Sequence, residues 1–305
     1  MYALRRLALF VPVWIGVAVL TFAMMRLIGG DPAQALYGGG ALSVAALQEV
    51  HHRLGLDRPL LVQLGAFLFN AVRGNFGDSW QSGTAVGPML AQRFPYTLEL
   101  ALTGLGLGTA AGLVLGIIAA VRQGSSLDRA LLIGSLLLLS VPGFWLGILL
   151  IYLFSVHLGW LPVAGAVGWQ SLVMPAGVLA ATGAPIVARV ARAGMLEVLR
   201  TEYIRTARAK GLGERMVLLR HALRNALNPI VTIVGLLFGN LLGGAIIVEQ
   251  VFSRPGIGTL AVQAIFARDY PLIQGIVLYT STVFLILNLV VDLSYTLTDP
   301  RVRFD

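Results

Sequence analysis

Residues that could carry catalytic chemistry are few in this sequence and poorly placed for it. Lys210 is the only lysine of the 305-residue chain, and Gly211 follows it, so a phosphate-binding loop ending in Lys-Ser or Lys-Thr is excluded. Glu99 and Asp292 are the only acids near the depth of the apolar segments, and we expect them at opposite membrane faces. They cannot form a catalytic pair, so we predict that the chain is not an enzyme.

Metal and thiol chemistry have no better support. The chain has no cysteine, which excludes disulfides and thiolate ligands. The histidines show no metal-ligand spacing and are His51, His52, His157 and His221. We predict no metal and no bound cofactor, and we expect Glu99 to form a structural ion pair with Arg26.

The composition is that of an integral membrane protein. Hydrophobic residues make up 57% of the chain and charged residues 12%, and the mean hydropathy is +0.83. The sequence pI near 10.4 could suggest nucleic acid as a partner. However, the basic residues lie between apolar runs, where orientation in a membrane explains them better, so we predict a lipid bilayer and no nucleic acid.

Apolar runs of about 20 residues predict membrane-spanning helices. We predict an all-α protein with six of them: Leu7–Met25, Leu98–Val121, Ala130–Val156, Leu172–Ala188, Ile230–Val248 and Leu272–Thr296. A helix capped by Ser43 and a second helix at Leu60–Val72 are too short to span, and we place them outside the membrane.

The distribution of basic residues orients these spans. With both termini in the cytoplasm, 15 of the 22 Lys and Arg residues lie on the cytoplasmic side. We expect residues 1–95 to form the first span plus an external segment. Residues 96–305 are expected to form a five-helix core containing a cytoplasmic loop at 189–225.

Several small or helix-breaking residues stand out within the spans. Glycines at four-residue intervals predict faces on which another helix packs closely: Gly104, Gly108, Gly112 and Gly116, then Gly235, Gly239 and Gly243. Pro142 predicts a kink that serves either helix packing or the lining of a pathway, where Trp145 would lie beside it. Asn240 forms either an interhelical hydrogen bond or part of a polar pathway.

The cytoplasmic loop holds most of the net charge. From Arg189 to Arg224 there are nine Lys or Arg residues and three Glu, which gives +6 of the formal +8. Helix-forming residues fill Ile204–Lys210 and Glu214–Leu223, and Gly211 and Gly213 lie between them. This pattern predicts a short helix–turn–helix outside the bilayer.

The same loop resembles the coupling loop of permease subunits of binding-protein-dependent ABC importers. Ala207, Gly211 and Leu223 match the general pattern of that loop, whereas Arg205, Thr206, His221 and Arg224 depart from it. At these positions the sequence resembles the branch of importers for dipeptides, oligopeptides, nickel and glutathione. The stretch Tyr203–Gly211 and other short stretches along nearly the whole chain resemble the same branch.

The resemblance implies a type I importer permease in the bacterial inner membrane. It further implies a second homologous permease, two cytoplasmic subunits that bind ATP and magnesium, and an external substrate-binding protein. The residues expected to couple to the ATPases are Arg205, Thr206, Ala207, Arg208, Gly211 and Leu223. Dipeptides or short oligopeptides are the expected substrates, with glutathione and nickel as alternatives. An ion-coupled secondary transporter is the alternative from another class, although paired acids and inverted repeats are not found.

Overall fold

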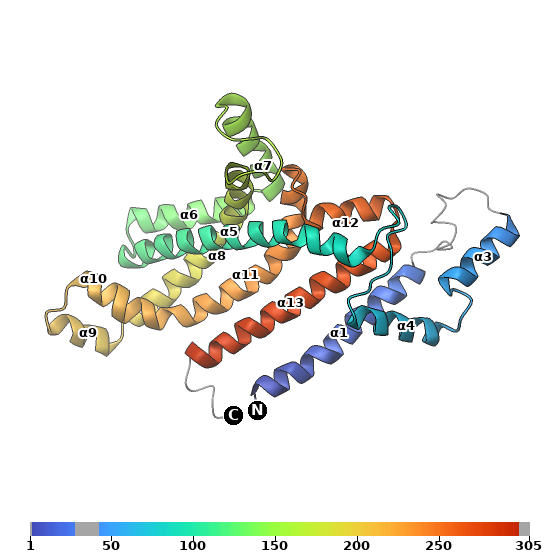
Figure 1. Ribbon diagram of the computed structural model, residues 1–305. Coiled ribbons are helices and arrows are strands. Elements are labelled where there is room, and N and C mark those ends of the chain that lie inside the picture. The colour runs from blue at the N-terminus through green and yellow to red at the C-terminus, as the bar shows by residue number, and fades with distance from the viewer. Residues whose placement is uncertain (1, 28–42, 299–305) are drawn as a thin grey trace. The chain divides into compact units, whose positions relative to one another are not determined.

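The computed structural model describes residues 2–27 and 43–298, and its regular structure is helical apart from one isolated bridge between Asp78 and Ala85 (Figure 1). The helices are α1 Tyr2–Leu27, α3 Val44–Leu54, α4 Leu60–Val72, α5 Val86–Val121, α6 Ser126–Ser140, α7 Gly143–Leu150, the π-helical η1 Ile151–His157, α8 Gln170–Leu199, α9 Glu202–Ala209, α10 Glu214–Met216, the π-helical η2 Val217–Ala222, α11 Leu223–Val251, α12 Ile257–Phe266 and α13 Tyr270–Thr298. The all-helical prediction is confirmed for this part of the chain.

Four of the described helical segments are long and apolar enough to cross a membrane. They are α5, α8, the continuous segment Glu214–Leu241 and Tyr270–Val290 of α13. The pair formed by α6 and the helix Gly143–His157 is a fifth candidate if the bent pair counts as one span. α1 contains the shorter apolar stretch Leu9–Met24. The prediction of a multi-span membrane protein is therefore confirmed.

The described residues form two compact units. The first contains the chain up to Pro95 together with Gly256–Thr296, and the second contains Tyr96–Pro255. The predicted division into 1–95 and 96–305 differs from this one, because α12 and the first turns of α13 share a core with the beginning of α5. The buried residues of that core are Val86, Leu90, Ile257, Leu260, Ala264, Leu272 and Ile276.

In the first unit, a buried carboxylate connects the loop between α4 and α5 to the start of α13. Asp269 is 1% exposed. It accepts hydrogen bonds from Ser79 Oγ, from the backbone N–H groups of Trp80 and Gln81, and from the N–H of Leu272 in the first turn of α13. The carboxylate thus caps the helix and fixes the loop, which local sequence patterns did not reveal.

The second unit is built on a close approach of α5 to α8. A Cβ added at Gly104 would lie 2.6 Å from Leu179 Cβ, and at Gly112 it would lie 2.6 Å from Val187 Cβ. At Gly108 and Gly116 it would meet backbone atoms of α8 at 3.1 and 2.6 Å. No larger residue fits at these positions without a shift of α8. An added Cβ at Gly243, by contrast, meets no atom of the chain within 4 Å.

The third predicted span, Ala130–Val156, is broken at Pro142. The helices on the two sides of the break differ in direction by 97°. Val141 has an extended backbone with φ −84° and ψ 121°, because the ring of a following proline opposes the helical conformation. The helix therefore changes direction at Pro142, as expected, but the change is a break between two helices: α6 ends at Ser140, and Pro142 is the N-cap of α7.

The fourth span is longer than predicted. α8 has 30 residues and continues through Pro175 and Pro185 instead of being interrupted by them. Proline at 175 has no N–H, so the carbonyl of Ser171, four residues earlier, loses its helical donor. Arg254 Nη1 donates to that carbonyl at 3.3 Å. The helix passes Pro175 with the lost hydrogen bond supplied by a side chain from outside α8.

Candidate functional site

The basic segment between α8 and α11 folds as the predicted helix–turn–helix. α9 ends before Gly211, and from Glu214 the chain runs through α10 and η2 directly into α11 (Figure 1). The helix that contains the predicted fifth span, Ile230–Val248, begins before Ile230, because the chain is already helical when it reaches Pro229, which lies inside α11. We refer to residues Glu202–Ala222 as the α9 segment.

One face of α9 is anchored in the second unit. Ile204 is 0% and Ala207 7% exposed, and both pack in a core with Met195 of α8 and Val217 and Ala222 of η2. The two α9 residues are three positions apart and so lie on the same face of the helix. α9 is therefore packed both against α8 and against the helix that continues into α11.

The other face of α9 is exposed and carries charge. Arg205 Nη1 lies 2.8 Å from Glu202 Oε1, with side-chain exposures of 72% and 81%, so this pair contributes little to stability. Arg208 reaches across the turn and donates from Nε and Nη2 to the Glu214 carboxylate at 3.1 and 2.6 Å. These hydrogen bonds raise the pKa of the Arg208 guanidinium above its ordinary value.

The turn depends on a glycine. Gly211 has φ +78°, a conformation that residues with a Cβ rarely adopt. Gly213 has φ −62° and ψ 141°, which any residue can adopt. An added Cβ would meet no atom within 4 Å at either position. The two glycines therefore differ in backbone conformation and not in available space.

The structure thus separates the six predicted coupling residues into three groups. Arg205, Thr206 and Arg208 are exposed, Gly211 forms the turn, and Ala207 and the partly buried Leu223 belong to the underlying core. Asn225 Nδ2 donates to the Tyr203 hydroxyl at 2.7 Å and braces α9 against α11. Sequence reasoning missed this brace, because the two residues are 22 positions apart.

An ion pair joins α8 to the first turn of α6. Arg192 donates from Nε and Nη2 to the two carboxylate oxygens of Asp128 at 2.7 and 2.8 Å, and the N–H of Gly124 donates to Asp128 Oδ2 at 3.0 Å. The Asp128 side chain is 3% exposed. Sequence analysis gave no role to this pair. The only available signal was a single acid between Arg122 and Arg129.

In the N-terminal half of α5, polar side chains join three helices. Thr97 Oγ1 donates to Glu249 Oε1 at 2.6 Å, and Arg254, which is 1% exposed, donates from Nη2 to Glu99 Oε2 at 2.9 Å. Together with the Ser171 carbonyl, these contacts connect α5, α8 and α11. We expected Arg26 as the partner of Glu99, but Arg254 fills that role, and the Arg26 side chain lies outside the described residues.

The three predicted pathway residues are all exposed in the single chain. Trp145 of α7 is 49% exposed, and Pro142 and Asn240 are exposed as well. Among the described residues, the Asn240 amide makes no hydrogen bond, so the interhelical bond considered for it is not formed within this part of the chain. The same part of the chain contains no cluster of three His, Cys, Asp or Glu residues that could hold a metal ion.

Comparison with known families covers almost the whole chain. Residues 112–304 match the family described as "Binding-protein-dependent transport system inner membrane component". Residues 1–101 match the N-terminal model described for the membrane component of such systems.

Two curated relatives are similar over nearly their full length. The Di/tripeptide transport system permease protein DppB of Pseudomonas aeruginosa is 41% identical, over 98% of this chain and 97% of the relative. The Glutathione transport system permease protein GsiC of Escherichia coli K12 is 43% identical, over 99% of both chains.

A solved structure shares the fold. A chain of the MetNI methionine ABC transporter, solved in inward-facing conformations, superposes with a TM-score of 0.61 at 19% sequence identity. The match covers 69% of this chain and 96% of that chain.

Proposed function

This chain belongs to the family of inner membrane components of binding-protein-dependent transport systems, and from this premise we propose that it forms half of the translocation pathway of an ATP-driven importer of short peptides. The family assignment makes it a non-catalytic permease. The main observation behind the proposal is that α9 has one face buried in the core and an opposite face that is exposed and charged.

The proposed substrate follows from what two relatives have in common. They are named for di/tripeptide and for glutathione transport, and their identities to this chain are similar at 41% and 43%. Glutathione is itself a tripeptide derivative, so a short peptide is the shared chemistry. Glutathione is the nearest alternative, and nickel, which another part of the same importer branch transports, is a second.

The proposed complex contains this chain, a second homologous permease, two cytoplasmic ATPase subunits and an external binding protein. The ATPase subunits would bind ATP and magnesium, since this chain has no phosphate-binding loop of its own. We propose six spans with both termini in the cytoplasm, adding α1 and the bent pair of α6 and α7 to the four long candidates.

In the proposed mechanism, closure of the ATPase dimer pushes on the exposed face of α9. Ile204 and Ala207 pass the displacement to Met195 of α8 and Val217 of η2, because packed interiors resist compression. α8 and α11 then move together and change access at the far end of the pathway.

A cysteine crosslink tests this function directly. The chain has no native cysteine, and Arg205 is preferable to Arg208 as the site because its only ion pair is exposed and weak. In membranes containing the whole complex, we expect Arg205→Cys to react with an impermeant maleimide from the cytoplasmic side and to crosslink to an ATPase subunit in a nucleotide-dependent way.

The matched control is Val167→Cys, at a residue that is 93% exposed in the proposed outer turn. It is expected to label from the outside and to form no ATPase crosslink. Outside labelling of Arg205→Cys would refute the orientation, and the lack of a crosslink to any ATPase would refute the coupling role.

A further inference from the structure

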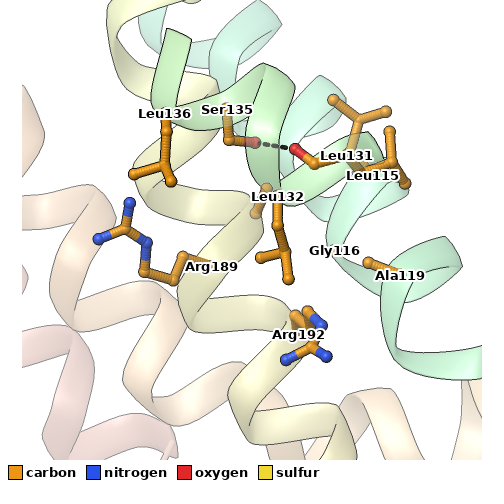
Figure 2. Close-up of a pocket in the computed structure, with 10 residues that line it drawn as sticks. Leu115, Gly116, Ala119, Leu131, Leu132, Ser135, Leu136, Arg189 and Arg192 are labelled. Carbon is orange, nitrogen blue, oxygen red and sulfur yellow. Dashed lines mark hydrogen bonds between the residues drawn. The ribbon is translucent and has the colours of Figure 1, made fainter. Parts of the chain in front are cut away.

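A small apolar cavity lies among α5, α6 and α8 in the second unit (Figure 2). Its volume is about 210 Å³. Its apolar lining consists of Leu115, Gly116, Ala119, Leu131, Leu132, Leu136 and Ala188. Ser135 also lines it, but its hydroxyl donates to the Leu131 carbonyl of its own helix at 2.7 Å. The cavity therefore suits a hydrocarbon chain.

Two arginines border the cavity, and only one of them is neutralised. The Arg192 guanidinium is paired in bidentate fashion with Asp128. Arg189 is exposed and forms no ion pair or hydrogen bond with any residue of the described chain. Figure 2 shows its guanidinium on the side of the cavity where Leu136 lies. A positive charge without a protein partner thus stands next to an apolar cavity.

The cavity also adjoins an apolar surface. Ile133, Leu136 and Leu137 of α6 are 58%, 55% and 64% exposed, and Leu136 belongs both to this surface and to the cavity wall. In a membrane protein such a face of a candidate span is available to acyl chains. A ligand could therefore enter from the lipid.

We propose that this site binds one anionic phospholipid, with part of an acyl chain in the cavity and the phosphate on Arg189. Anionic lipid headgroups are attracted to basic residues near the ends of spans, and Arg189 directly follows the apolar run Leu172–Ala188, which is the predicted fourth span. The volume of about 210 Å³ is below the roughly 300–1,000 Å³ of typical small-molecule pockets, which fits one chain of a lipid better than a peptide.

Native mass spectrometry of the complete complex in mild detergent tests the proposal, with phosphatidylglycerol and phosphatidylcholine titrated separately. We expect one retained phosphatidylglycerol per chain. Arg189→Gln should weaken its binding about fivefold, the effect of one basic residue on an anionic lipid. Ala119→Leu, which fills the cavity, and Leu136→Gln, which makes its exposed wall polar, should also reduce retention.

Arg220→Gln is the charge-matched control, because Arg220 is exposed and does not line the cavity. It should leave retention unchanged. Equal retention of phosphatidylcholine, or equal losses with Arg220→Gln and Arg189→Gln, would overturn the headgroup assignment. Unchanged retention in both wall variants would place the lipid elsewhere. A photocrosslink from position 136 to another protein subunit would show that a protein covers the site.

Discussion

At the scale of single residues, Arg254 combines two roles that few side chains could fill together. Its Nη1 donates a hydrogen bond to the Ser171 carbonyl, which lacks a helical donor because of Pro175. Its Nη2 donates to the Glu99 carboxylate. The planar guanidinium carries donors pointing in different directions, which a lysine ammonium cannot reproduce in the same geometry. Arg254 therefore stabilises both α8 and the contact of α8 with α5.

Arg254→Lys is expected to lower the free energy of unfolding by about 1–3 kcal/mol, because at least one buried acceptor loses its donor. Glu99→Gln should cost less, because its side chain is 53% exposed and the amide oxygen can still accept from Nη2. The midpoint of thermal unfolding of the purified complex measures both effects. Equal midpoints for the two variants would contradict the bridging role.

Arg205→Lys is the matched control for this comparison. It makes the same substitution in an ion pair whose side chains are both more than two-thirds exposed. We expect a change of less than about 1 kcal/mol there, as for other exposed pairs.

At the scale of helices, α5 and α8 can pack closely because the residues of α5 at the contact are glycines, which have no side chain. Gly104, Gly108, Gly112 and Gly116 face α8 along one stripe, and the added Cβ distances show that the two backbones approach too closely for alanine. In a membrane, where lipid tails compete with apolar side chains, such close packing is a main source of helix association. The proposed lipid cavity lies beside this stripe, since Gly116 lines it.

We predict that Gly112→Ala destabilises the complex by about 1–3 kcal/mol, as overpacking usually does, because the new Cβ would lie 2.6 Å from Val187 Cβ and 2.7 Å from the Ala184 carbonyl oxygen. Gly106→Ala makes the same change in the same helix, where an added Cβ meets nothing within 4 Å. This control should be neutral or stabilising by up to about 1 kcal/mol, because alanine favours helices. A lower unfolding midpoint for Gly106→Ala than for Gly112→Ala would refute the packing argument.

At the scale of the whole molecule, the proposed function requires that a push on one short helix reaches the spans. The α9 segment is held to α8 by buried side chains and to α11 by continuous helix through η2. Its turn at Gly211 fixes the direction in which α9 is presented. In the proposed mechanism, the work of the ATPases would therefore depend on the shape of this segment.

Gly211→Val is expected to uncouple transport from ATP hydrolysis. Valine at φ +78° costs about 1–3 kcal/mol of backbone strain, which the turn can relieve only by changing shape. If that strain acts on the coupled step, peptide uptake by reconstituted complexes should fall about tenfold or more, while ATP hydrolysis persists. Gly213→Val, at φ −62°, is the matched control and should transport normally. Normal uptake by Gly211→Val would count against the proposed coupling.

The sequence by itself determined the features that depend on neighbouring residues. Apolar run length predicted most of the helices, the Ser43 cap and the short helix α4 lie where they were expected, and the glycines at 211 and 213 predicted the turn of the α9 segment. These features follow from backbone conformational preferences and from periodicity, which are local. The resemblance of the loop to importer permeases predicted the family that the comparisons then showed.

Only the tertiary structure decided whether each proline ends a helix or lies within one, and which charged side chains form ion pairs. Pro142 ends a helix, whereas Pro175 lies within one, since Arg254 from a distant segment replaces the hydrogen bond lost at Pro175. The pairs of Asp128 with Arg192 and of Glu99 with Arg254 are 64 and 155 residues apart in sequence. Such contacts depend on which helices pack together and in what register, and a single sequence contains no local signal for that choice.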